Sequence, residues 1–276
     1  MSELIKTICH GREIHLAWNP LREEITPLIR QGFIPIEMSE GAVSYTDNLG
    51  LDHHNELSGR PPACISALEH YGHISREEIG HFMVNHTDAD CVMAGLTLLG
   101  VLDFSIHEVL NREIGMLDVN PFEKPIENLN FGQIIRAWQL AISMEKKSGW
   151  NWIYGLQLFV DLLEKKELFG SYIEKIMLGE EKRQIAAKRD ISLALLGRSG
   201  RIAAFNSTVW GYDLQFGRLH EESADTINGW TFLCLIARVE KTGNVMLSCP
   251  SEKIAEEAFG AGGLMNVFPI LPTING

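Results

Sequence analysis

The sequence lacks the features of several large protein classes. It has only 5 cysteines in 276 residues and no C-x-x-C pair, which indicates reduced thiols rather than a disulfide framework. No stretch approaches the roughly 18 apolar residues of a membrane helix. The first residues, MSELIKTICHGREIHLAW, have no continuous apolar segment typical of a secretory signal. We therefore expect a cytoplasmic protein without a membrane partner.

Positive charge is also scarce. The chain has 24 Lys and Arg against 36 Asp and Glu, for a net charge of −12. Sequence-independent binding to long nucleic acid depends on clustered Lys and Arg, so this class of partner is not expected. A small anionic substrate remains compatible with the charge, because a bound metal ion can reverse the sign of the local field.

The sequence pattern divides the chain into three regions. Over residues 1–126, short apolar runs bounded by Gly and Pro alternate with helical patterns, and residues 1–40 read as short strands and turns. This alternation predicts an α/β fold with a mostly parallel sheet and flanking helices. Residues 127–189 repeat apolar side chains near a 3.6-residue period and predict a helical connector. Residues 190–276 predict a smaller α+β domain.

Two polar clusters follow strand-like runs. His86, Asp88 and Asp90 alternate along "NHTDAD", so in an extended segment they share one face. An imidazole with two carboxylates suits Mn²⁺, Mg²⁺, Fe²⁺ or Zn²⁺. The second cluster is Asp52-His53-His54. Ligands of open parallel sheets lie beyond the carboxyl ends of the strands, so both clusters are expected at that edge. Two metals about 3.5–4 Å apart would clamp the attacking and leaving oxygens of a phosphoryl displacement.

These two motifs resemble those of the DHH phosphoesterase superfamily. The resemblance rests on Asp52-His53-His54 and on the His-x-Asp-x-Asp pattern that begins at His86, and it covers about residues 40–120. In the family the His-x-Asp-x-Asp motif comes first, whereas here the order is reversed; a circular rearrangement can preserve a site while the termini move. The resemblance implies a Mn²⁺-dependent hydrolase of phosphoesters or phosphoanhydrides, with a metal-bearing α/β domain, a helical linker and a substrate-binding C-terminal domain.

The same resemblance implies metal ligands. His86 and Asp88 would bind one metal, and Asp90 and His53 would bind the other. The family also uses two further aspartates that typically bridge the metals. Asp118, in "MLDVNP", is the candidate for one of these positions, and the candidate for the other is Asp47.

Three residues are candidates for catalysis. The resemblance implies that His54 touches the phosphoryl group or acts as an acid, and that Asp52 orients the adjacent histidine. Arg60 follows in "SGRPP" and has the planar guanidinium that suits phosphate oxygens. In the expected substrate domain, "GRSGR" at 197–201 and "FGAGGL" at 259–264 combine arginines and glycines that suit an anion.

Other interpretations stay open at this point. Asp88 or Asp90 can serve as a helix N-cap, Asp118 can simply end a helix, and His53 and Arg60 can be solvated. The leading prediction is a phosphoesterase acting on a small, nucleotide-like phosphorylated substrate. The alternatives are a metal-dependent hydrolase of an amide or ester, which needs one metal with an open position, and a non-catalytic binding protein. The Trp- and Leu-rich helical segments are candidates for a homodimer interface.

Overall fold

In the computed structural model the chain opens with a β-hairpin. β1 (Glu3–Cys9) pairs antiparallel with β2 (Arg12–Trp18). The turn between them needs two positive φ angles, 51° at His10 and 70° at Gly11, and the glycine adopts its angle without steric cost. Along β2, Ile14 and Leu16 are fully buried on alternate positions, as expected for a strand with one face on the core.

The chain divides into two compact units. The first comprises Met1–Val119 and Glu123–Ile173, and the second comprises Asn120–Phe122 and Glu174–Gly276. The structure describes residues 3–40, 43–54, 57, 59–119, 129–143, 145, 147–164, 178, 182, 185–187, 189–198, 202–208, 234–249, 255–256, 259–261 and 263.

The first unit contains a four-stranded sheet in the order β1-β2-β6-β3. β2 and β6 are parallel, and β6 and β3 are parallel, so the carboxyl ends of these three strands lie at one edge. A separate hairpin, β4 paired antiparallel with β5, follows β3. The further elements of this unit are α1 (Arg22–Arg30), β3 (Ile34–Pro35), β4 (Met38–Glu40), β5 (Val43–Tyr45), α2 (Ala63–Leu68), β6 (Gly80–Val84), α3 (Ala89–Leu99), α4 (Phe104–Val119), α5 (Leu129–Ser143) and α6 (Gly149–Glu164).

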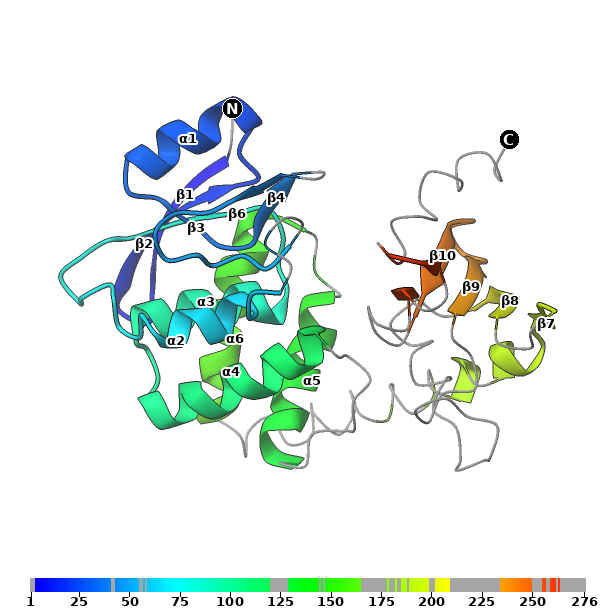
Figure 1. The fold of residues 1–276 in the computed structure, drawn as a ribbon. Coiled ribbons are helices and arrows are strands. Elements are labelled where there is room, and N and C mark those ends of the chain that lie inside the picture. The colour runs from blue at the N-terminus through cyan, green and yellow to red at the C-terminus, as the bar shows by residue number, and fades with distance from the viewer. Residues whose placement is uncertain are drawn as a thin grey trace. The chain divides into compact units, whose positions relative to one another are not determined.

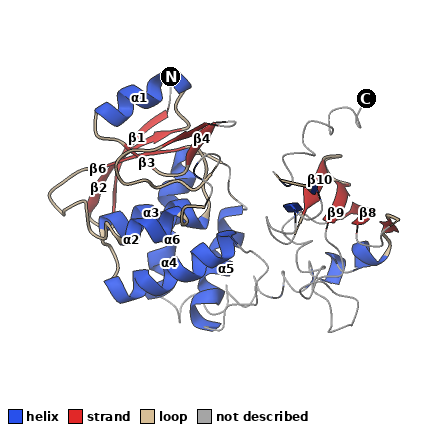
Figure 2. Cartoon of the chain, viewed as in Figure 1, coloured by secondary structure: helices blue, strands red, loops and turns tan. Residues whose placement is uncertain are grey.

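Helices cover both faces of this sheet (Figure 1). On one face, Ile25 of α1 packs with Ala17 of β2 and Met83 of β6. On the other face, Phe82 of β6 lies with its ring centroid 5.4 Å from that of Trp152 in α6. The colouring by secondary structure in Figure 2 shows the sheet between α1 and the remaining helices. The layers place loops, rather than helices, at the carboxyl ends of β3 and β6, where a site can form.

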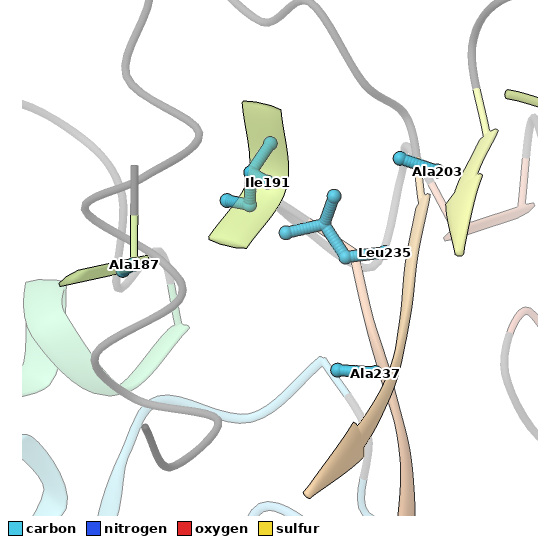
Figure 3. Close-up of a cluster of buried hydrophobic side chains, with 5 residues drawn as sticks. All are labelled: Ala187, Ile191, Ala203, Leu235 and Ala237. Atoms are coloured by element: carbon cyan, nitrogen blue, oxygen red, sulfur yellow. The ribbon is translucent and has the colours of Figure 1, made fainter. Parts of the chain in front are cut away.

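The second unit has its own sheet, in the order β10-β9-β8-β7. β8 and β9 are parallel, and the other two pairings are antiparallel. Figure 3 shows its small core, in which side chains of the strands face a short helical segment. The core residues are Ala187, Ile191, Ala203, Leu235 and Ala237. The strands are β7 (Leu195–Leu196), β8 (Ile202–Ser207), β9 (Cys234–Val239) and β10 (Val245–Ser248).

The expected α/β class is confirmed in its coarse form, since both units mix strands and helices. Within the first sheet only the β2–β6–β3 part is parallel, because β1 returns as a hairpin. The expectation of only strands and turns over 1–40 is wrong, because α1 forms there. The three-part division at 126 and 189 stays a prediction; the structure groups α5 and α6 with the first unit. Among the described residues, every helix is too short or too polar to span a membrane.

Candidate metal centre

The site begins where two parallel strands end. Glu37 follows β3 by two positions, and His86 follows β6 by two positions. The backbone joins the two strand ends, because the N–H of Ile36 donates to the carbonyl of Met83 at 3.0 Å. Both side chains therefore leave the same edge of the sheet, and Nε2 of His86 lies 3.2 Å from Oε2 of Glu37.

The segment from 51 to 54 closes the site from the other side. The N–H of Glu37 donates to the carbonyl of Leu51 at 2.8 Å, which fixes this segment beside the strand end. Asp52 is fully buried, and its Oδ1 accepts from the backbone N–H and from Nδ1 of His54 at 2.9 and 3.0 Å. His54 is thereby anchored through Nδ1, which leaves Nε2 as the nitrogen that can meet another group.

Glu37 lies at the centre of the cluster. Its side chain is fully buried, and its backbone has a φ of 50°, a conformation that costs about 1–3 kcal/mol for a residue other than glycine and is common at functional sites. One carboxylate oxygen, Oε1, lies 3.1 Å from Nε2 of His53, and the other, Oε2, lies 3.2 Å from Nε2 of His86. A single carboxylate thus faces a different histidine with each of its oxygens.

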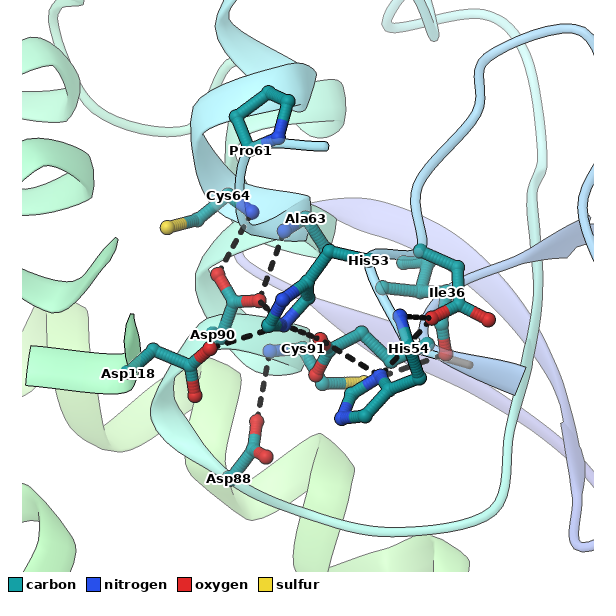
Figure 4. A network of polar contacts seen from close by, with 12 residues as sticks. Ile36, His53, His54, Pro61, Ala63, Cys64, Asp88, Asp90, Cys91 and Asp118 are labelled. Carbon is teal, nitrogen blue, oxygen red and sulfur yellow. Dashed lines mark hydrogen bonds and ion pairs between the residues drawn. The ribbon is translucent and has the colours of Figure 1, made fainter. Parts of the chain in front are cut away.

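Two sets of potential ligands share this carboxylate. The first set is Glu37, His86 and Asp88, and the second is Glu37, His53, Asp90 and Asp118; in each set the ligand atoms lie within 4.8 Å of one another. In the first, Nε2 of His86 lies 3.1 Å from Oδ2 of Asp88. In the second, Nε2 of His53 lies 2.9 Å from Oδ2 of Asp118 and 3.9 Å from Oδ2 of Asp90. Figure 4 shows the carboxylates of Asp118 and Asp90 directed toward the imidazole ring of His53.

In a third set the ligand atoms also lie within 4.8 Å of one another; its members are Glu37, His53 and His54. Nδ1 of His54 is 3.9 Å from Oε1 of Glu37 but only 3.0 Å from Oδ1 of Asp52. Because Nδ1 is already bonded to Asp52, this nitrogen is the weakest ligand candidate in the cluster.

Two of the central atoms are buried and unsatisfied. Among the described residues, neither Oε1 of Glu37 nor Nε2 of His53 makes a well-aligned hydrogen bond, although the two atoms are 3.1 Å apart and Nε2 also lies 2.9 Å from Oδ2 of Asp118. Their orientation is therefore not that of a donor facing an acceptor. Unpaired buried polar atoms are costly and demand an explanation, such as an ion. A cation between them would accept lone pairs from both, so the residues present fit a metal.

The aspartates are held in place by two helix N-termini. The backbone N–H groups of Ala63 and Cys64, at the start of α2, donate to the two oxygens of Asp90 at 2.8 Å each (Figure 4). Asp88 is the N-cap of α3, with Oδ1 accepting from the N–H of Cys91 at 2.9 Å. Its Oδ2 is left to face His86. Each helix start thus orients one carboxylate of the site.

The electrostatics of the cluster reflect crowded carboxylates. Burial first, and then the charge of Glu37, raises the pKa of Asp90 well above its usual range. Burial also opposes charging of Glu37, but contacts with His53 and His86 outweigh it and hold the pKa of Glu37 low. For His86 burial acts downward, yet contacts with Asp88 and Glu37 raise its pKa to about 10. Protons on these groups therefore offset the negative charge of the carboxylates. Divalent cations bound at the same place would offset it instead.

Most of the residues predicted for the site lie close together in the structure. Those that gather around Glu37, from segments as far apart as 53 and 118, are His53, His86, Asp88, Asp90 and Asp118. Asp52 and His54 lie against them. Whether these residues act in the predicted roles stays a prediction.

Asp47 and Arg60 lie apart from the ligand sets. Oδ1 of Asp47 accepts from the N–H of Leu49 at 2.9 Å, within its own turn, and Asp47 belongs to none of the described groups of metal-ligand atoms. Arg60 is exposed, and its guanidinium lies beside Gly50. Parts of 197–201 and 259–264 fall outside the described residues, so the arginine and glycine motifs of the expected substrate domain are not placed.

Glu37 was absent from the sequence-based candidates. It stands inside the apolar run "FIPIEM", where it looks like the polar side of a strand. A signal was present, because an acidic residue directly after a strand-like run matches the pattern of the His86 cluster. The parallel pairing of β3 with β6, which brings the two together, is not visible in the sequence.

No protein-family model, curated protein or solved structure matches the chain. The interpretation of the site therefore depends on its own geometry and chemistry.

Proposed function

We propose that this protein is a metal-dependent phosphoesterase that hydrolyses a phosphoester or phosphoanhydride of a small, nucleotide-like substrate with two metal ions, most suitably Mn²⁺. The observation that carries the proposal is the Glu37 carboxylate, which faces one ligand set with each oxygen. A carboxylate in this position is suited to bridge two cations. Ligands that are mostly carboxylates, with imidazole, suit Mn²⁺ better than soft-ligand metals.

The ligand sets divide the two cations between them. His86 and Asp88 would hold one ion, and His53, Asp90 and Asp118 would hold the other, with Glu37 shared. When bound, such a pair of ions stabilises negative charge on a phosphoryl group and lowers the pKa of water. It would also offset the mutual repulsion of the buried carboxylates, which burial makes costly when they are uncompensated.

His54 is the residue suited to proton transfer. Its Nδ1 is held by Asp52, and this contact is the main reason that the pKa of His54 is raised. The contact with Asp52 favours the charged imidazole, so Nε2 is suited to donate a proton to a leaving oxygen. The side chain is 45% exposed, which leaves it accessible to a substrate. Arg60 is also exposed and follows on the same loop, and its planar guanidinium suits a phosphate oxygen.

The test combines metal analysis with a hydrolysis screen. Purified protein loaded with Mn²⁺ should carry two ions per chain and release phosphate or a nitrophenol from generic phosphoesters, nucleotides and pyrophosphate. His86→Ala and Asp88→Ala should abolish hydrolysis while the circular dichroism spectrum stays that of the wild type.

Other results would decide against the proposal. One zinc ion per chain with ester or amide hydrolysis would favour the single-metal alternative. No bound metal, and a thermal midpoint that a chelator does not change, would favour a non-catalytic binding protein.

A further inference from the structure

We infer that Asn85 is a positioning residue for the metal centre: its side-chain amide holds Nδ1 of His86 and so presents Nε2 to Glu37 and Asp88. The inference rests on the proposed function, because it explains how one ligand of that site is oriented. Asn85 itself touches none of the carboxylates of the cluster in the described contacts; it acts through His86.

The direction of each hydrogen bond follows from a backbone carbonyl. Nδ2 of Asn85 lies 2.7 Å from the carbonyl oxygen of Ser39 in β4. A carbonyl oxygen can only accept, so it requires the amino group of the amide on this side. The amide oxygen, Oδ1, must then face Nδ1 of His86, at 2.7 Å. Because Oδ1 can only accept, Nδ1 carries the proton.

This proton position determines what the other nitrogen offers. With the Nδ1 proton held by Asn85, Nε2 is the nitrogen that gives up its proton when the ring becomes neutral to bind a metal, and the lone pair is then on Nε2. Nε2 is the atom that lies 3.2 Å from Oε2 of Glu37 and 3.1 Å from Oδ2 of Asp88. The Ser39–Asn85–His86 chain therefore fixes both the tautomer and the ring orientation that a metal ligand requires.

A comparison with His54 shows what the neutral amide contributes. His54 is also anchored through Nδ1, but by the carboxylate of Asp52. A carboxylate partner stabilises the charged imidazolium, which suits a proton donor. An amide partner orients the ring without adding negative charge, which suits a ligand in a cluster that already has several carboxylates. The two histidines thus have partners matched to different tasks.

The competing explanation is structural. Asn85 links the end of β6 to β4 through Ser39, and loss of that link alone could loosen the site. Two substitutions separate the explanations. Asn85→Ala removes both contacts. Asn85→Asp keeps an acceptor for Nδ1 of His86 but loses the donor to Ser39, and it places a carboxylate beside a carbonyl oxygen.

The experiment is a titration of the metal-free full-length chain with Mn²⁺, following free Mn²⁺ by electron paramagnetic resonance. We expect two classes of site in the wild type. Asn85→Ala should weaken one class by about ten- to a hundredfold, the usual effect of losing such a partner, and leave the other within about threefold. Asn85→Asp should retain both classes within about threefold of the wild type. Asn151→Ala is the control, because it makes the same truncation at an asparagine that lies on α6, and it should bind as the wild type does.

The contrary outcomes are distinct. Equal weakening by Asn85→Ala and Asn85→Asp would assign the effect to the Ser39 link and overturn the inference. The inference would also be overturned if the wild type binds two Mn²⁺ ions and Asn85→Ala binds them with the same affinity. That result would leave the proposed function intact. A wild type that takes up no Mn²⁺ overturns both. If Asn85→Ala does not fold, Asn85→Ser, whose hydroxyl is one bond shorter than the amide, takes its place.

Discussion

A buried glutamate with a strained backbone organises the candidate site. Glu37 is fully buried, adopts a φ of 50° and has an oxygen that lies 3.1 Å from Nε2 of His53 without a well-aligned hydrogen bond. Each of these features costs free energy in a protein that does nothing with them. Together they support the proposal that this carboxylate binds a cation.

Glu37→Gln tests this view against a matched substitution. The glutamine keeps the shape but removes the charge shared by the two ligand sets, so we expect bound Mn²⁺ to fall from two ions to fewer than one per chain. Hydrolysis should fall by at least about a hundredfold. Asp47→Asn makes the same chemical change at a carboxylate outside both sets. It should leave Mn²⁺ content unchanged, as measured by elemental analysis; equal losses in the two variants would contradict the central place of Glu37.

At the scale of elements, α3 couples the site to the core. Its N-terminus presents Asp88 and Asp90, and all of its residues from Ala89 to Leu99 are buried. Close packing holds it there: a Cβ added at Gly95 would lie 2.7 Å from Cζ2 of Trp152 in α6. The position of the aspartates therefore depends on contacts along the whole helix.

Gly95→Ala should destabilise the protein although alanine is the better helix former. The clash with the indole ring costs about 1–3 kcal/mol, which exceeds the roughly 1 kcal/mol gained in helix propensity. Urea denaturation monitored by fluorescence measures the change. An increase in the free energy of unfolding would show that Trp152 moves aside without cost.

The packing of α3 against α4 should make the free energy of unfolding fall at acidic pH. His107 is fully buried, its Nε2 accepts from the N–H of Leu102, and its Nδ1 meets Oγ1 of Thr97. Burial lowers its pKa from 6.5 to about 4. Between these values the unfolded chain binds a proton that the folded chain does not, so stability is lost as the pH falls from about 6.5 toward 4.

The loss should reach about 3 kcal/mol at pH 4 relative to pH 7. His107→Gln does not titrate and should lose correspondingly less over the same range, as measured by urea denaturation at each pH. An identical acid dependence in both proteins would assign the effect to other groups.

For the molecule as a whole, bound metal should act as a stabilising ligand. Each ion present at about 100 times its dissociation constant adds about 2.7 kcal/mol to the folded state. For a chain of this size, we expect a chelator to lower the midpoint of thermal unfolding by about 5 °C or more. Differential scanning calorimetry with Mn²⁺ and with chelator measures the shift, and coincident transitions would contradict metal binding by the folded state.

Much of the local structure followed from the sequence because its signals are local. The segment "GHFMV" is apolar and bounded by polar residues, and it forms β6; Asp88 precedes a run of small and apolar residues and caps α3. Residues 1–40 were expected to form strands and turns, whereas α1 forms there with Pro27 inside it. Its apolar residues Ile25, Leu28 and Ile29 nevertheless pack on one side against the sheet, and this tertiary contact outweighs the missing backbone donor.

By itself the sequence determined which chemical groups are available: the histidines and aspartates of two motifs, in an acidic chain with few cysteines. Residue type and spacing are local properties, so they could be read directly. Only the tertiary structure decided which groups meet. The parallel pairing of β3 and β6 brought Glu37 to His86, and the packed fold brought His53, Asp90 and Asp118 to the same carboxylate. These contacts join residues up to 81 positions apart, and they form only when the core packs.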